Sequence, residues 1–241
     1  YAGQKWKTLD LHPYLKHVNR RIKYHGHHET HAKAGFYTSP FDNACVLVVD
    51  AIGEFNTTSI WYATQDYLSK LWTENYPKSL GLFYSAITHR VGLKPNEEEY
   101  ILMGMAAYGD PYLYYSHMRK LLDVNLHRGC RWWLPGESES MRYDMAASAQ
   151  MIYEEEFEKL LQLASKTSPS KNLVLMGGCA LNCVANNIAL KYFDDVWIMP
   201  APGDSGSSLG AILAETETKV NWRGPYLGHN IERDYPVGKL M

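Results

Sequence analysis

Two histidines stand four residues apart in the string HHETHA, which covers residues 27–32. On a helix this spacing puts the imidazoles of His27 and His31 on one face, where their neutral nitrogens can share a divalent metal. The zinc-protease motif is excluded, because it requires the order HExxH and Glu29 lies two places after His27. A surface helix that simply contains several histidines explains the string equally well.

Two carboxylates extend this pattern. Asp50 ends an apolar run that begins at Cys45, and Asp204 lies in a Gly-Asp-Ser-Gly loop after a second apolar run. A carboxylate at the end of a buried strand projects from the edge where α/β proteins place their sites, although ordinary turn chemistry also uses aspartate. Together with His27 and His31 they form a mixed N/O set suited to iron, manganese or zinc.

A glycine pair, Gly177 and Gly178, separates a predicted strand from a predicted helix. Such a turn lets backbone N–H groups approach a phosphate, but a tight left-handed turn explains the pair as well. It matches neither the Walker nor the dinucleotide fingerprint. Asn182 and Asn186 follow four residues apart, a spacing that suits contacts to a ribose or base and equally suits a solvent-facing helix surface.

The elements that must position these residues follow from hydrophobic periodicity. β-branched and apolar runs predict strands at 45–50, 59–64, 67–73, 172–176 and 196–199. Helical spacing predicts helices at 11–24, 27–36, 79–92, 144–164 with Asp144 as N-cap, 181–192 and 209–216. Strands that first meander and then alternate with helices indicate the α/β class.

The composition excludes several classes of protein. The chain of 241 residues has 24 Lys+Arg, 26 Asp+Glu and 46% hydrophobic residues, which is not a disordered composition. No apolar run is long enough to span a membrane, and four scattered cysteines form neither a disulfide framework nor a CxxC zinc pair, so we expect a cytoplasmic protein. Residues 1–33 have a net charge of +5, suited to a phosphate-bearing partner or to a solvated face.

Six strings occur together and in a fixed order: HHETHA at 27–32, VVDAIGE at 48–54, SLGLFYS at 79–85, MGMAAYG at 103–109, GGCALNCVAN at 177–186 and PGDSG at 202–206. In this combination the chain resembles the O-carbamoyltransferases of nodulation-factor and antibiotic biosynthesis. These are related to the enzymes that make threonylcarbamoyl-adenosine in tRNA.

The resemblance implies an actin/sugar-kinase-like (ASKHA) fold of two lobes with a nucleotide in the cleft. Carbamoyl phosphate and ATP would give a carbamoyl-adenylate, whose carbamoyl group passes to an acceptor hydroxyl. By position, His27, His31, Asp50 and Asp204 would be both catalytic residues and ligands of a divalent metal, iron foremost. The adenylate would be contacted by Glu54, Gly177, Gly178, Asn182, Asn186 and Gly203.

The same resemblance implies a division of the chain. Residues 1–40 would be a basic, His-rich helical part of the first lobe, and residues 41–223 the catalytic α/β lobe, mainly the second lobe of the fold. Residues 224–241 would lead toward a C-terminal YrdC-like domain, which makes the adenylate in the family and which here would be a separate domain or protein. Exposed sheet edges favour self-association.

The acceptor is the open question. Arg131 and Trp132 belong to a Trp-Arg-rich segment that could stack on a base or sugar and contact a phosphate, or could cover the sheet as an aromatic plug. The string NEEEYILMG at 96–104 is similar to versions in phage and marine bacterial members, which suggests a hydroxymethylated pyrimidine of DNA or a nucleotide as acceptor. The alternatives are threonylcarbamoyl transfer to tRNA adenosine and a non-catalytic module that binds metal and nucleotide.

Overall fold

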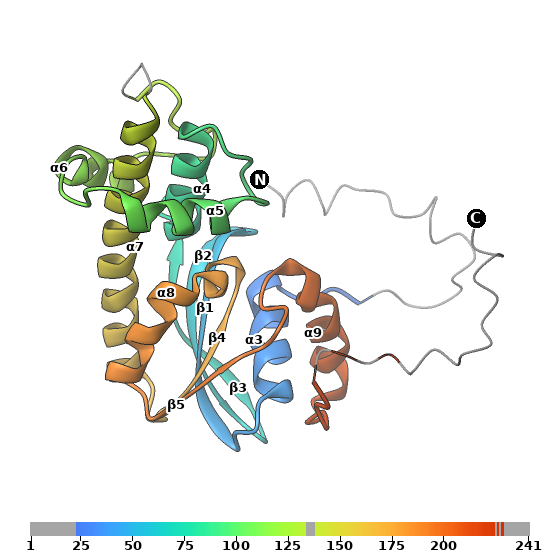
Figure 1. Ribbon diagram of the computed structural model, residues 1–241. Coiled ribbons are helices and arrows are strands. Elements are labelled where there is room, and N and C mark those ends of the chain that lie inside the picture. Colours follow the sequence, from blue (N-terminus) through green and yellow to red (C-terminus); the bar gives the residue numbers. More distant parts are fainter. Residues whose placement is uncertain (1–22, 134–137, 225, 227, 229–241) are drawn as a thin grey trace, which may run out of the picture.

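The computed structural model describes residues 23–133, 138–224, 226 and 228. Its centre is a five-stranded sheet in the order β3-β2-β1-β4-β5, as Figure 1 shows. The first three strands are antiparallel and β4 and β5 run parallel to β1. Their bounds are β1 (Asn43–Gly53), β2 (Asn56–Thr64), β3 (Leu68–Asn75), β4 (Asn172–Met176) and β5 (Asp195–Ile198). All five predicted strands and the mixed α/β class are therefore confirmed.

The pleat of β1 divides the core into two layers. Cys45, Leu47 and Val49 pack into one hydrophobic cluster, whereas Val46 and Val48 pack into another on the opposite face. Because alternate side chains of a strand point to opposite faces, a central strand buried on both sides must be apolar throughout. This explains the continuous apolar run before Asp50.

Helices cover both faces of the sheet. On one face lie α3 (His27–Thr38), which packs on β1 and β4, and α9 (Asp204–Thr216), which packs on α3. The long helix α7 (Glu139–Thr167) and α4 (Leu80–Arg90) cover the other face (Figure 1). The shorter elements are α5 (Glu99–Met105), η1 (Ala106–Tyr108), α6 (Tyr115–Met118), η2 (Arg119–Asp123), η3 (Gly178–Leu181), α8 (Cys183–Asn186) and η4 (Asn187–Lys191).

Two predicted helices differ from the structure, one in where it starts and one in its continuity. Helix α7 begins at Glu139, five residues before the predicted start, because Ser138 is its N-cap and accepts a hydrogen bond from the Met141 N–H. Asp144 instead accepts one from the Asp110 N–H. The predicted helix 181–192 is instead a series of short helical turns. The Asn182 side chain accepts a hydrogen bond from the Ala185 N–H and thereby caps a new short helix, α8.

The other helices agree with the predictions or extend them. Helix α3 continues two residues beyond the predicted end at Phe36, and α9 starts at Asp204 rather than at Leu209. The predicted helix at 11–24 and most of the tail at 224–241 lie outside the described residues. Within the described part of the chain, none of the helices combines the length and the apolar character that a membrane crossing requires.

Candidate metal centre and adjoining cavity

His27, His31, Asp50 and Asp204 converge at one point, with one ligand atom of each within 4.8 Å of all the others. The His27 Nε2 atom lies 2.9 Å from Asp50 Oδ2 and 3.3 Å from Asp204 Oδ1. The His31 Nε2 atom lies 3.3 Å from Asp204 Oδ1 and 3.0 Å from the Nε2 atom of His27. Three elements therefore supply the four residues: α3 the histidines, β1 Asp50, and the first turn of α9 Asp204.

The backbone fixes one oxygen of Asp50 and leaves the other to the cluster. Its Oδ1 atom accepts hydrogen bonds from the N–H groups of Ala51, at 2.8 Å, and Gly178, at 3.4 Å. Its Oδ2 atom faces the histidines. The glycine of the GGCALN string thus contributes to holding the predicted ligand.

Helix α9 approaches α3 closely enough to bring Asp204 to the cluster. A Cβ atom on Gly210 would lie 1.9 Å from the Thr30 carbonyl oxygen, so no other residue fits there without moving one helix. The side chain of Asp204 is 74% exposed, whereas that of His31 is fully buried. The cluster is therefore deep on its α3 side and open on its α9 side.

The electrostatics of the cluster favour positive charge at its centre. Burial lowers the pKa of His27, but hydrogen bonds with Asp204 and Asp50 outweigh it and raise the pKa to about 10. Hydrogen bonds with His27 and His31 lower the pKa of Asp204. Burial opposes ionisation of Asp50, yet the hydrogen bond with His27 lowers its pKa.

These residues fit a divalent metal. Two imidazole nitrogens that face each other at 3.0 Å, with two carboxylate oxygens beside them, concentrate lone pairs that need a shared cation. The set of two nitrogens and two oxygens suits iron, manganese or zinc. Within the described residues the Nδ1 atom of His31 has no hydrogen-bond partner, so its ring is held by the cluster and by packing.

A cavity of about 400 Å³ adjoins the cluster, and Asp50 and Asp204 form part of its wall. Of the predicted nucleotide-binding residues, Gly178, Asn182 and Gly203 line it. Helix α9 begins at this wall, and the N-terminus of a helix presents N–H groups and partial positive charge suited to phosphate. The wall thus combines the carboxylates of the candidate metal centre with a phosphate-compatible backbone.

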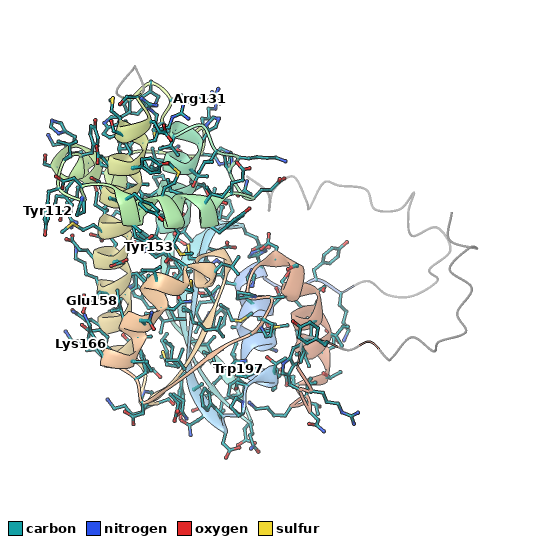
Figure 2. All side chains as sticks on the ribbon, viewed as in Figure 1. Tyr112, Arg131, Tyr153, Glu158, Lys166 and Trp197 are labelled. Atoms are coloured by element: carbon teal, nitrogen blue, oxygen red, sulfur yellow. The ribbon has the colours of Figure 1, made fainter. Side chains whose placement is uncertain are left out.

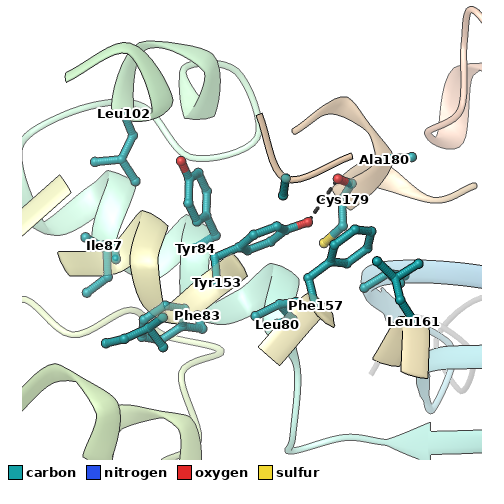
Figure 3. Close-up of a cluster of buried hydrophobic side chains, with 14 of the residues drawn as sticks. Leu80, Phe83, Tyr84, Ile87, Leu102, Tyr153, Phe157, Leu161, Cys179 and Ala180 are labelled. Atoms are coloured by element: carbon teal, nitrogen blue, oxygen red, sulfur yellow. Dashed lines mark hydrogen bonds between the residues drawn. The ribbon is translucent and has the colours of Figure 1, made fainter. Parts of the chain in front are cut away.

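The predicted residue Asn182 is held in the cavity wall by Gln150, a residue that the sequence did not predict. Gln150 of α7 donates to Asn182 Oδ1 at 3.2 Å and accepts from Asn182 Nδ2 at 3.0 Å. Gln150 also accepts from the Tyr84 hydroxyl at 2.7 Å. Beside them the Tyr153 hydroxyl donates to the Cys179 carbonyl at 3.0 Å, as drawn in Figure 3. Asn182 is consequently a structural residue of the wall, with little capacity left for a ligand.

The far wall of the cavity contains a carboxylate that the sequence also did not predict. Glu99 accepts from the Ser85 hydroxyl and from the Asn96 N–H, both at 2.7 Å. Glu97 and Tyr100 line the same wall. In the sequence, the only sign of this wall was the string NEEEYILMG. The string is similar to versions in family members, but it does not indicate which of its side chains enters the site.

Five of the predicted nucleotide- and acceptor-binding residues are not part of the cavity lining. Glu54 occupies the turn between β1 and β2, at φ 60°, and Asn186 donates to the Ala180 carbonyl. Gly177, at φ 91°, packs against the Val49 carbonyl, where a Cβ atom would be 2.2 Å from its oxygen. Arg131 and Trp132 are exposed and do not line the cavity, and Arg131 lies at the far end of α7 in Figure 2.

Comparison with known proteins adds an independent line of information. A protein-family model described as "Carbamoyltransferase N-terminus" matches residues 4–127 and 130–213. The uncharacterized protein sll1178 of Synechocystis is 35% identical over 86% of this chain, and nodulation protein NolO of Bradyrhizobium diazoefficiens 31% over 78%. Nodulation protein U of Rhizobium fredii is 47% identical over 29% of the chain. The alignments cover 37% of sll1178 and of NolO and 13% of nodulation protein U.

Proposed function

The chain belongs to the carbamoyltransferase family defined by that N-terminal model, and we propose that it carries the metal-dependent transfer site of an O-carbamoyltransferase. The observation that carries the proposal is the convergence of His27, His31, Asp50 and Asp204 beside a cavity whose wall includes the two aspartates. The actin-like two-lobed fold and the division of the chain near residues 40 and 224 are part of the same proposal.

The reaction transfers the carbamoyl group of a carbamoyl-adenylate to an acceptor hydroxyl. The hydroxyl oxygen attacks the carbamoyl carbon, the bond from that carbon to the phosphate oxygen breaks, AMP leaves, and the hydroxyl proton passes to water. A divalent metal, when bound, supplies Lewis-acid polarisation of a carbonyl oxygen and favours deprotonation of a hydroxyl. His27, His31, Asp50 and Asp204 would hold it.

The remaining residues bind and orient the donor. The first turn of α9, with Gly203 and Ser205 at the cavity wall, suits the single phosphate of an adenylate. The adenine and ribose would occupy the part of the cavity between Asn182 and Tyr100. No lysine or arginine is among the described residues that line the cavity, which favours a preformed adenylate over the more highly charged ATP.

The same charge distribution bears on the acceptor. The ionisable acidic side chains of the lining are Asp50, Glu97, Glu99 and Asp204. Acidic walls repel a polyanion, so a neutral or cationic polyhydroxy compound is favoured over a hydroxymethylated pyrimidine in DNA. An aminoglycoside-like sugar is therefore the first acceptor to test and a hydroxymethylated nucleotide the second.

The test supplies the metal-loaded chain with synthetic carbamoyl-adenylate and measures AMP release with and without an acceptor. Acceptor-dependent release that is lost in the His27→Ala/His31→Ala variant supports the transferase. Binding of the adenylate without release in any acceptor screen identifies a non-catalytic module instead. Turnover that requires threonylcarbamoyl-adenylate and tRNA identifies the related tRNA-modifying activity.

A further inference from the structure

Helix α3 begins without the usual polar cap. Gly26, its N-cap residue, has no side chain to accept a hydrogen bond from the first turn. Uncapped first turns fray easily, since their N–H groups have no intrahelical partner. His27, the first helical residue, nevertheless places its Nε2 atom 2.9 Å from Asp50. Other contacts must hold this turn in place.

One such contact is made by Gly53 at the end of β1. A Cβ atom on Gly53 would lie 2.5 Å from the Cδ2 atom of His27 and 2.4 Å from the Cδ2 atom of His28. Non-bonded carbon atoms pack at about 3.5–4.0 Å, so both rings rest directly over the bare Cα. Gly53 is not among the residues with positive φ. Glycine is therefore needed here for space and not for a special backbone conformation.

The second contact ties the same turn to the sheet. The Nδ1 atom of His28 lies 2.7 Å from the Ser59 hydroxyl of β2. That hydroxyl also accepts from the Trp61 indole N–H at 2.8 Å. All three side chains are buried. Buried hydrogen bonds of this kind fix one rotamer, because breaking them leaves unpaired polar groups.

We propose that Gly53 and the His28–Ser59–Trp61 chain position His27 for metal binding, in place of a helix cap. Gly53 sets how closely the His27 ring approaches β1, and His28 sets the rotation of the first turn of α3. Asp50 is fixed by backbone N–H groups, so the geometry between Asp50 and His27 depends on that turn. This inference rests on the proposed metal centre and assigns a role to residues that do not touch the metal ligand atoms.

The experiment is a set of matched Gly→Ala variants of the full chain, titrated with Co²⁺ and followed by its visible absorption. Gly53→Ala is expected to weaken Co²⁺ binding about 10–100-fold and to change the spectrum, because the added methyl group would displace the His27 ring. Gly104→Ala is the control without a clash, because nothing lies within 4 Å of its added Cβ. Gly109→Ala is the control for general damage, since its Cβ would lie 2.0 Å from the Tyr143 carbonyl oxygen.

A second pair of variants keeps the test decisive if Gly53→Ala does not fold. His28→Asn retains an amide group near the position of Nδ1 and is expected to keep Co²⁺ affinity, whereas His28→Leu is expected to lose it. Affinities of Gly53→Ala or His28→Leu equal to wild type overturn the positioning role, and so does an equal loss in folded Gly109→Ala. Failure of the wild-type chain to bind Co²⁺ overturns the metal centre itself, so the two failures are distinguishable.

Discussion

The two faces of the sheet are built in different ways. The α7 face is a thick apolar layer that contains Phe83 and in which the rings of Tyr153 and Phe157 stack (Figure 3). The α3 face is thinner and contains buried polar side chains, namely His28, His31, Lys33 and Ser59. The histidines of the candidate metal centre come from the thin face, and much of the cavity wall comes from the thick face.

Close packing on the α3 face depends on glycine. Gly35 has Met176 and Val174 side chains within 2.6 Å of its missing Cβ, and Gly210 lies against the Thr30 carbonyl. Helix α3 is thus held between the sheet and α9 with no room for larger residues. The α7 face therefore buries more apolar side chains than the α3 face, whereas the α3 face provides the histidines of the candidate metal centre.

The largest effect is expected from removing the two histidines. His27→Ala/His31→Ala deletes half of the donor atoms, so the purified variant should hold no metal where the wild type holds about one equivalent. Elemental analysis after loading with Fe²⁺, Mn²⁺ or Zn²⁺ measures this. His117→Ala is the matched control, because His117 is exposed and lies outside the cluster. Equal metal content in the His27→Ala/His31→Ala and His117→Ala variants would refute the proposed metal centre.

The next largest effect is expected on the α7 face and should concern stability alone. Phe157 is fully buried, so Phe157→Ala should lower the free energy of unfolding by about 3–5 kcal/mol. Denaturant titration measures it, with Leu190→Ala as an exposed control expected to change it by less than about 0.5 kcal/mol. The folded fraction of Phe157→Ala should bind metal as the wild type does. A matching loss of affinity would show that the two faces are not separate in function.

A smaller effect, on the pH dependence of metal affinity, is expected from the raised pKa of His27. Because this pKa is raised from 6.5 to about 10 in the metal-free protein, His27 holds a proton at neutral pH that metal binding must displace. Apparent affinity should rise about tenfold per pH unit between pH 6 and 8. The raised pKa also stabilises the metal-free fold. Its contribution to the free energy of unfolding is fully present below pH 6.5 and is lost as the pH rises toward about 10.

Calorimetry of metal binding in two buffers of different protonation enthalpy measures how many protons are released for each metal ion bound. Release of about one proton per metal at pH 7 is expected. Affinity independent of pH, with no proton released, contradicts a cationic His27 between the two carboxylates.

Local patterns in the sequence predicted the strands and singled out the four cluster residues, and the family resemblance was needed to group these four as one site. A strand buried on both faces must be apolar where it is covered, and Asp50 comes two residues after Val48, the last β1 residue paired with β4. Glu99 and Gln150 could not be found in this way, because nothing local distinguishes them from other polar helix residues. The role of Gly53 could not be found in this way either, since its contact with the histidine rings depends on how α3 packs against β1.

The smallest effect is expected at the Trp-Arg segment. Trp132 is 64% exposed and Arg131 is also exposed, so Arg131→Ala/Trp132→Ala should change the free energy of unfolding by less than about 0.5 kcal/mol. The neighbouring Trp133 differs, because it is half-buried, packs against the ring of Tyr114 and accepts a hydrogen bond from Arg90 on its carbonyl oxygen. Trp133→Ala should therefore destabilise the protein and serves as the contrasting variant.

For catalysis, the Arg131→Ala/Trp132→Ala variant should transfer carbamoyl to a small sugar acceptor at the wild-type rate, because neither residue lines the cavity. A long or polyanionic acceptor is the sharper probe. If transfer to a hydroxymethylated oligonucleotide occurs and falls in this variant alone, the segment is an outer contact for the acceptor and the acidic cavity admits only the reacting base. Equal rates for every acceptor leave the segment as a surface feature, with acceptor choice made inside the cavity by the wall that carries Glu97 and Glu99.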